Sequence, residues 1–252
     1  MHALTHLPSP NLEQGLRTHV TGQSIDYDLA VQQHSAYCRL LRDCGVTVRT
    51  LATHPELPDG VFIEDTAVVL EEVAILATMG TAARRAELAG IEPELRKYRP
   101  LQRLELPARL EGGDILRVGR ALLVGLSART DKAGVQALAE IVEPLAYRVL
   151  PVRVPGCLHL KTACTALPDG TLLVNPAWIN PADLGGYELL PVPETEPWGA
   201  NVLLVGNCVC VAAEHELTAG MLQRRGFELR TVPLSEFAKA EGGMTCLSLL
   251  FD

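Results

Sequence analysis

Aromatic residues are scarce in this chain: Phe, Tyr and Trp make up only 4% of its 252 residues. A buried core must therefore be built mainly from Leu, Val, Ile and Ala side chains. Hydrophobic residues still reach 48% of the chain against 21% for charged residues, a balance typical of a folded globular protein. We expect residues 1–252 to form one domain with a full core.

Positive charge and long apolar runs are also lacking. The formal net charge is −8 and the sequence pI is about 5.4, whereas binding to nucleic acid or to an anionic membrane needs clustered Lys and Arg. The best apolar run is interrupted by Glu71 and Glu72, so no segment reaches membrane-spanning length. We expect neither a nucleic acid nor a membrane as a partner. An acidic protein can, however, attract a small cationic molecule.

No export signal and no disulfide framework are visible. The first residues lack a basic segment followed by an apolar core, and seven cysteines are an odd number without framework spacing. We therefore expect reduced thiols and a cytoplasmic location. Cys208 and Cys210 share one face of a strand-like run, where core packing is favoured over a metal site. The chain has no P-loop, GxGxxG or HExxH motif, and we expect no cofactor and no metal.

One pattern recurs along the chain: two short apolar strands joined by a tight polar turn, then a helix, then another short strand. The turns of the hairpins lie at 71–72, 119–120, 169–170 and 206–207. The helical segments are 27–44, 82–98, 131–141 and 214–225, and short strands follow at 46–48 and 227–229. The unit returns at roughly 40–50 residues, which indicates a radial or solenoid architecture. Five units, the first formed partly by the amino-terminal segment, account for the chain.

Three side chains of the types used in nucleophilic catalysis stand at the ends of first strands of these units. Cys246 follows a glycine-rich turn, His159 lies in an apolar run that we interpret as a strand, and Glu111 precedes paired glycines. Each has a simpler interpretation: a buried thiol, a core histidine and an ordinary turn. In a radial arrangement, however, these strand ends meet near the central axis. Their shared position therefore suggests a Cys/His/carboxylate unit.

Charged residues at neighbouring junctions allow two interpretations each. Asp59, Glu64 and Asp65 surround the entry of an otherwise apolar strand, where ionised carboxylates are costly to bury without donors or a cation. They are either solvated acids or the floor of a pocket for a guanidinium. Arg84 and Arg129 stand at strand-to-helix junctions, where they are either surface charge or a clamp for a carboxylate.

These segments together resemble the dimethylarginine dimethylaminohydrolases, which belong to the guanidine-modifying superfamily with the pentein fold. Five motifs in the right order, spread over nearly the whole chain, carry the resemblance. They are Leu57–Asp65 (LPDGVFIED), Leu110–Asp114 (LEGGD), Leu126–Thr130 (LSART), Leu158–Thr162 (LHLKT) and Gly243–Ser248 (GMTCLS). The resemblance implies an α/β fold, the five-bladed β/α propeller of the penteins, with its hairpin–helix–strand units arranged around a central pocket.

The resemblance also implies roles for individual residues. Cys246 would be the nucleophile, His159 the general acid and base, and Glu111 a carboxylate that orients the guanidinium. The implied substrate-binding residues are Asp65 at the guanidinium, Glu64 in support, Asp59 at the α-amino group, Arg84 and Arg129 at the α-carboxylate, Ala240 in the pocket, and Leu16 in an amino-terminal flap.

The implied reaction is hydrolysis of the C–N bond of methylated arginines to citrulline and an amine, without a cofactor. A free thiol with a pKa of about 8.5 is mostly protonated at neutral pH, so the bound cation would help to form the thiolate. Attack and protonation of the departing amine by His159 leave a covalent thiouronium, which water then hydrolyses.

Two alternatives remain. The same scaffold serves enzymes that deiminate free arginine or act on another guanidino acid, and it also serves non-catalytic binding proteins. A non-catalytic pentein has no need of Cys246, His159 and Glu111 together. The sequence leaves a monomer and a homodimer equally open.

Overall fold

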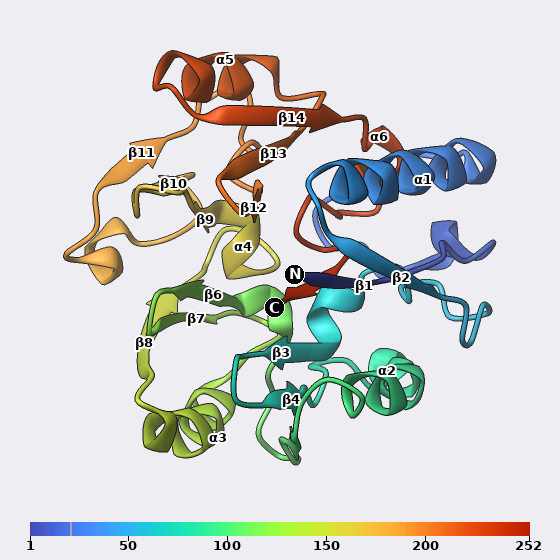
Figure 1. Cartoon of the computed structure of the whole chain (residues 1–252), viewed down its shortest axis with the longest axis vertical. Helices are drawn as coiled ribbons and strands as arrows, with labels where there is room; N and C mark the ends of the chain where they lie inside the picture. The colour runs from blue at the N-terminus through green and yellow to red at the C-terminus, as the bar shows by residue number, and fades with distance from the viewer. Residues whose placement is uncertain (21) are drawn as a thin grey trace.

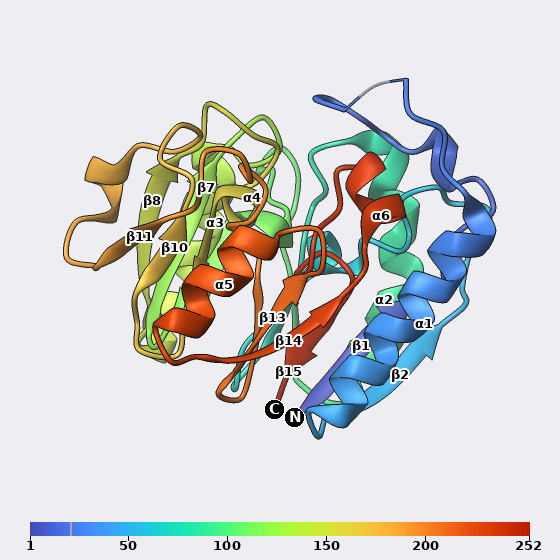
Figure 2. The same cartoon turned by 90° about the horizontal axis from the view of Figure 1, so that it is seen from above.

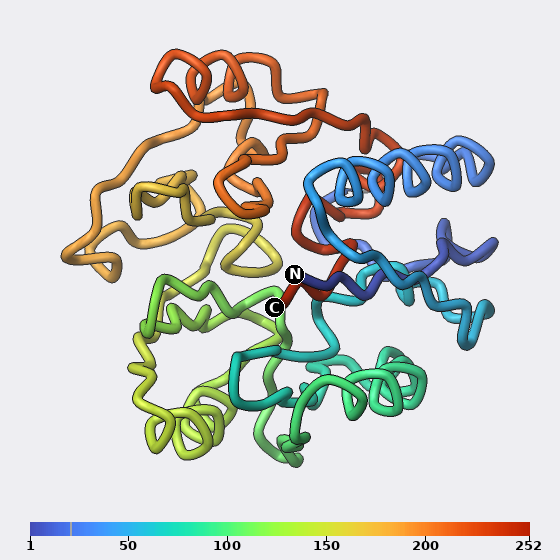
Figure 3. The backbone as a smooth tube through the Cα atoms, viewed as in Figure 1, coloured from blue at the N-terminus to red at the C-terminus, as the bar shows by residue number. Residues whose placement is uncertain are grey.

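The computed structural model describes residues 1–20 and 22–252. Within them, the strands form five sheets of three strands each, arranged around a central axis with both chain ends close to it (Figure 1). The chain passes through the sheets one after another around this axis (Figure 3). This is the radial arrangement of five units that the repeat predicts.

We number the sheets 1 to 5 in the order β15-β1-β2, β3-β4-β5, β6-β7-β8, β9-β10-β11 and β12-β13-β14. The inner strands are β15 (Leu249–Phe251), β3 (Ala67–Val69), β6 (Ile115–Val118), β9 (Cys164–Ala166) and β12 (Leu203–Val205). The middle strands are β1 (His2–His6), β4 (Ala74–Leu76), β7 (Ala121–Leu126), β10 (Leu172–Val174) and β13 (Cys208–Ala212). The outer strands are β2 (Thr47–Leu51), β5 (Leu101–Arg103), β8 (Arg148–Arg153), β11 (Leu189–Pro191) and β14 (Glu228–Val232).

Every sheet has the same topology. The inner strand is antiparallel to the middle strand, and the middle strand is parallel to the outer one. In sheets 2 to 5 the antiparallel pair is a hairpin, closed by the polar turns that the sequence predicts. A parallel pair needs a crossover connection, and helices supply it in four sheets. They are α1 (Tyr27–Asp43), α2 (Leu88–Leu95), α3 (Lys132–Val142) and α5 (Glu216–Arg224).

The remaining short elements differ more from the expectation. In sheet 4 the crossover contains the 3-10 turn η6 (Pro181–Leu184) in place of an α-helix, and the segment predicted at 82–98 is divided into η3 (Ala82–Glu87) and α2. Two short helices, α4 (Leu160–Ala163) and α6 (Ser235–Lys239), lie outside the crossovers. The other 3-10 turns are η1 (Leu12–Gln14), η2 (Ile63–Thr66), η4 (Gly112–Asp114) and η5 (Glu143–Leu145).

Sheet 1 closes the ring. Its middle and outer strands come from the amino-terminal segment, as expected, but its inner strand β15 is the carboxyl-terminal one. The register pairs His2 with Phe251 and Leu4 with Leu249. The two ends of the chain therefore complete one sheet between them.

The core consists of five hydrophobic clusters, each lying between two neighbouring sheets. Successive side chains of a strand point to opposite faces, so each middle strand contributes to two clusters. On β7, Leu122 and Val124 pack toward sheet 2, whereas Leu123 packs toward sheet 4. Burial of a Leu or Val side chain contributes roughly 1.5–3 kcal/mol, and it does so here on both faces of the sheet.

The described residues include no helix that combines the length and the apolar character needed to cross a bilayer.

Candidate active site

Four of the predicted site residues, the three catalytic ones and Asp65, stand at equivalent positions in different units, just before an inner strand. Asp65 lies in η2 before β3, Glu111 precedes η4 and β6, His159 precedes α4 and β9, and Cys246 precedes β15. Because inner strands converge on the axis (Figure 1), residues that are far apart in sequence meet there.

His159 is held by two carboxylates. Its Nε2 lies 2.7 Å from Glu111 Oε2, and its Nδ1 lies 3.7 Å from Asp65 Oδ1. Glu111 is itself fixed, because its Oε1 accepts the Gly80 N–H at 2.8 Å and its side chain is fully buried. Since Nε2 is engaged with Glu111, Nδ1 is the nitrogen available for proton transfer.

The backbone around His159 corrects one prediction: His159 is not in a strand. It has an extended conformation at the residue before α4, with φ −136° and ψ 159°. Asp114 fixes this segment, because its Oδ1 accepts the Leu160 N–H at 2.9 Å and its Oδ2 accepts the Ser127 hydroxyl at 2.7 Å. Gly113 allows the close approach, since a Cβ there would lie 2.8 Å from the imidazole ring of His159.

The carboxylates set the charge of the imidazole. Burial opposes protonation of His159, but Asp65 and Glu111 outweigh it and raise the pKa of His159 to about 9. In turn, the pKa of Asp65 is lowered despite burial by His159 and Arg84. At neutral pH the site therefore contains an imidazolium between two carboxylates.

Asp65, Glu111 and His159 also have ligand atoms within 4.8 Å of one another, as a metal site would. The hydrogen bond from Nε2 to Glu111 and the raised pKa of His159 account for the cluster in another way. A protonated imidazole has no lone pair to give to a metal ion.

Cys246 lies at the end of the glycine-rich turn, half-buried. The Gly243 N–H points to its sulfur at 3.3 Å, and the Cys246 carbonyl accepts the Glu64 N–H at 3.2 Å. Burial and the nearby Glu64 and Asp65 carboxylates raise the pKa of the thiol to about 12. Without a cation beside it, this thiol is protonated at neutral pH. The paired glycines serve close approach, because a Cβ on Gly242 would lie 2.3 Å from the Phe62 ring.

One small cavity contains most of the predicted site residues. The thiol of Cys246 and the imidazole of His159 both line it. The other predicted residues that line it are Leu16, Asp59, Asp65, Arg84, Arg129 and Ala240. Its volume is about 20 Å³, which is room for a single water molecule and not for an amino acid.

The two arginines differ in how far their charge is already used. Arg84 is buried and donates to Asp65 at 2.6 Å and to Glu87 at 2.8 and 2.9 Å. Among the described residues, the Arg129 guanidinium makes one longer contact, 3.3 Å from Glu111 Oε1. Arg129 is therefore the guanidinium with more capacity to bind an incoming carboxylate.

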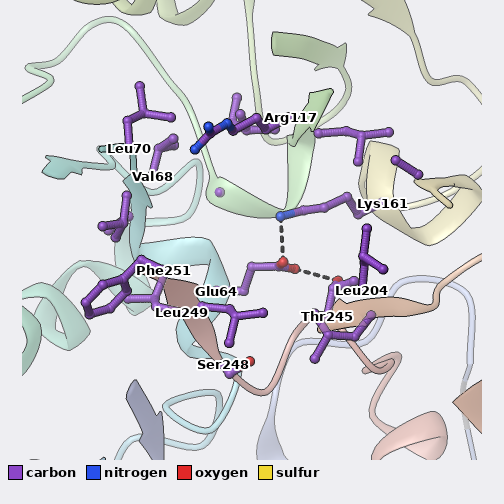
Figure 4. Close-up of a pocket in the computed structure, with 18 of the residues that line it drawn as sticks. Glu64, Val68, Leu70, Arg117, Lys161, Leu204, Thr245, Ser248, Leu249 and Phe251 are labelled. Atoms are coloured by element: carbon purple, nitrogen blue, oxygen red, sulfur yellow. Dashed lines mark hydrogen bonds and ion pairs between the residues drawn. The ribbon is translucent and has the colours of Figure 1, made fainter. Parts of the chain in front are cut away.

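Glu64 is not brought into this cavity. Its carboxylate accepts Lys161 Nζ at 2.5 Å and the Thr245 hydroxyl at 2.7 Å, and these three side chains line a larger cavity of about 300 Å³ between the inner strands (Figure 4). Glu64 thus supports the site through its backbone, whose N–H donates to the Cys246 carbonyl. Sequence reasoning missed Lys161, although it lies within the LHLKT motif.

The amino-terminal segment 15–20, which we call the flap, contributes Leu16 to the lining of this cavity, and two carboxylates hold the segment. Asp59 accepts the Leu16 N–H at 3.2 Å. One oxygen of Glu241 accepts the backbone N–H groups of Thr18 at 2.6 Å, Val20 at 2.7 Å and His19 between them. Figure 2 shows the segment after η1 at the end of the molecule opposite to the chain termini. Sequence reasoning missed Glu241, because a contact across more than 200 residues leaves no local signal.

Comparison with known proteins agrees with this geometry. Residues 17–174 match the family described as "N,N dimethylarginine dimethylhydrolase, eukaryotic". A protein of Streptomyces coelicolor named N(G),N(G)-dimethylarginine dimethylaminohydrolase is 40% identical over 249 residues, which cover 98% of this chain and 95% of the relative.

Solved structures have the same fold. The dimethylarginine dimethylaminohydrolase of Pseudomonas aeruginosa, as a cysteine-to-serine mutant complexed with citrulline, superposes with a TM-score of 0.94 at 32% identity, covering 99% of this chain and 98% of the other. The N-terminal domain of the arginine dihydrolase ArgZ shares the fold at 22% identity, with a TM-score of 0.84 over 98% of this chain and 97% of that one.

The five-unit ring is the pentein propeller, the fold of guanidine-modifying enzymes. Within that superfamily, this chain belongs to the dimethylarginine dimethylaminohydrolase family.

Proposed function

We propose that this protein hydrolyses the C–N bond of asymmetric dimethylarginine and monomethylarginine to citrulline and di- or monomethylamine, through a covalent thiouronium on Cys246. The observation that carries the proposal is that the carboxylate-held imidazole of His159 lines the same cavity as the thiol of Cys246. Family membership supports a hydrolase of linear amidines, and the Pseudomonas relative contains citrulline.

We assign the binding roles from charge and position. Asp65 accepts hydrogen bonds from the guanidinium, and Asp59 faces the α-amino group at the flap end of the cavity. Arg129, with Arg84 beside it, binds the α-carboxylate. Leu16 and Ala240 line the space around the aliphatic stem. Glu111 orients and charges His159 and does not hold the guanidinium, because its oxygens are engaged by His159, Gly80 and Arg129.

The two pKa shifts give the order of events. The free site holds a neutral thiol and an imidazolium at neutral pH. A guanidinium bound beside Asp65 offsets the negative charge that disfavours the thiolate, so the thiol loses its proton to solvent as substrate binds. The thiolate attacks the guanidinium carbon, and His159 Nδ1–H protonates the departing amine. The neutral imidazole then takes a proton from the water that hydrolyses the thiouronium and releases citrulline.

Replacement of the nucleophile tests the proposal. We expect Cys246→Ser to lower kcat roughly a thousandfold or more, because a serine hydroxyl is a much weaker nucleophile in this site, while far-ultraviolet circular dichroism stays unchanged. His159→Ala should bind substrate but stall turnover. Turnover by Cys246→Ser near the wild-type rate would refute the assignment.

A substrate panel tests the specificity separately. Asymmetric dimethylarginine, monomethylarginine and arginine are supplied in parallel, and dimethylamine, methylamine and ammonia are measured. Release of dimethylamine at the highest kcat/KM supports the proposal. Release of ammonia from arginine at a higher kcat/KM would place the protein with the arginine deiminases.

A further inference from the structure

Three cysteine thiols meet at the contact between sheets 1 and 5. Cys208 and Cys210 lie on the same face of β13, and Cys44 is the residue that ends α1. Their sulfur atoms all lie within 4.8 Å of one another. The sequence pattern alone shows only the pair Cys208 and Cys210, and two thiols are too few ligands for a metal site. The fold adds a third thiol from Cys44, 164 positions before Cys208.

The spacing suits a metal ion bound by sulfur. Metal–thiolate bonds of about 2.3 Å in a tetrahedral site place the sulfurs about 3.8 Å apart. Pairs that already lie within 4.8 Å need only small side-chain rotations to reach that spacing. The two β13 thiols are buried, whereas Cys44 is half-buried and leaves a route for an ion to enter.

The ligand types select the class of ion. The cluster contains thiols alone, without an imidazole or carboxylate in the set, and apolar side chains such as Leu40, Leu41 and Val205 pack in the same region of the core. Sulfur ligands in apolar surroundings favour Cu⁺ and Zn²⁺ over Mg²⁺ or Ca²⁺.

The local charges are favourable for a cation. Cys44 ends a helix of 17 residues, and the partial negative charge at a helix carboxyl end attracts cations. Arg230 on β14 is the register partner of Cys210. Its positive charge would offset part of the negative charge of three thiolates. Glu228, the register partner of Cys208, acts in the opposite direction and is itself paired with Arg230 at 2.9 Å.

We propose that Cys44, Cys208 and Cys210 form a three-thiolate site for a thiophilic d10 cation, Cu⁺ or Zn²⁺, separate from the catalytic cavity. Three sulfurs complete a trigonal Cu⁺ site, and Zn²⁺ takes water as a fourth ligand on the half-exposed side of Cys44. The bound ion replaces the thiol protons. It joins the carboxyl end of α1 to β13, on the side of the molecule away from the flap (Figure 2).

The test uses the Cys246→Ser protein, so that the catalytic thiol does not contribute. Cd²⁺ serves as the spectroscopic probe, and Zn²⁺ and Cu⁺ are then titrated against a chelator of known affinity. We expect one equivalent of Cd²⁺ to give an ultraviolet thiolate-to-metal charge-transfer band. We also expect Cu⁺, which thiolates prefer, to replace that band with its own absorption, and expect Zn²⁺ or Cu⁺ added to the metal-free protein to raise the unfolding temperature.

Variants assign the signal to the cluster. Adding Cys44→Ala should remove the band and weaken binding at least tenfold, because a half-buried helix-end position tolerates alanine without loss of fold. Cys38→Ala is the matched control: Cys38 is on the same helix beside His34, and its removal should leave the band intact. Absence of a band in Cys246→Ser, or a band that survives Cys44→Ala, would overturn the proposal.

Discussion

His159 is the residue on which the proposed chemistry of this site depends. Two carboxylates from different units hold it, and a third, Asp114, fixes the backbone on which it stands. Buried charges of this kind are stable only when each has its partners. In the reaction proposed above, this arrangement keeps a proton ready for the leaving amine at a pH where a free histidine is largely neutral.

The raised pKa of His159 predicts a pH dependence of stability. Its value is about 9 in the folded protein against an ordinary value of 6.5. The stabilisation from the charged ring is therefore complete below pH 6.5 and is lost as the pH rises through 9. We expect the difference in unfolding free energy between wild type and His159→Asn to shrink by roughly 3 kcal/mol across this window.

Urea denaturation of both proteins at several pH values measures this difference. Glu111→Gln is the control. It removes one of the two carboxylate charges that raise the pKa of His159 and should therefore narrow the pH range over which the stabilisation is lost. A difference that stays constant with pH would mean that His159 is neutral in the folded protein.

Gly113 makes the close approach of His159 and Asp65 possible, and its replacement should be costly for activity. A Cβ there would lie 2.6 Å from Asp65 Oδ1 and 2.8 Å from the His159 ring. We expect Gly113→Ala to lower kcat roughly a hundredfold, because displacement of a catalytic group by about 1 Å has effects of that size. Gly185→Ala, at a glycine with φ −54° and only an ordinary contact at 3.8 Å from an added Cβ, should leave kcat unchanged. Equal kcat in both variants would contradict this role of Gly113.

At the scale of elements, the flap is held by few contacts. Its backbone is pinned at Leu16 by Asp59 and at Thr18, His19 and Val20 by a single oxygen of Glu241. Glu241 itself has φ +63°, a conformation that costs free energy in a residue other than glycine. Because Glu241 is strained and makes the main contact with the flap, it is suited to release the flap.

Removal of the Glu241 carboxylate should open the flap. We expect Glu241→Ala to raise KM about tenfold, as an ordered flap contributes binding contacts, and to speed hydrogen exchange at the amides of Thr18, His19 and Val20. Mass spectrometry of peptides from this segment measures the exchange. Glu13→Ala, an exposed glutamate of η1 just before the flap, is the control. Unchanged protection in Glu241→Ala would show that other contacts hold the flap.

At the scale of the whole molecule, stability is distributed over five clusters between sheets, and the chain ends complete sheet 1. Leu4 belongs to the cluster between sheets 1 and 2 and is fully buried. We expect Leu4→Ala to destabilise the protein by roughly 2–5 kcal/mol. Leu217→Ala, at a side chain that is 55% exposed, should change stability by less than about 0.5 kcal/mol. Thermal unfolding compares the two, and equal losses would argue against a closed ring of cores.

Much of this ring was predictable because its signals are local. The turns at Glu71–Glu72 and Gly206–Asn207 and the helix end at Gly45 are specified by adjacent residues. The short apolar run around His159 was interpreted wrongly as a strand, since four to seven apolar residues fit a strand and a buried turn equally well. The contact of Glu241 with the flap has no local signature. A cytoplasmic location stays a prediction.

The small volume of the cavity lined by Cys246 and His159 has a kinetic consequence. A space that holds one water molecule has no room for an arginine derivative, so we expect exchange of ligand to require the flap to leave Asp59 and Glu241. The association rate constant of a competitive inhibitor is then limited by how often the flap opens, and not by diffusion. A compound that fits beneath the closed flap would owe its potency to a long residence time. Its dissociation rate, measured after dilution, is therefore the quantity to optimise.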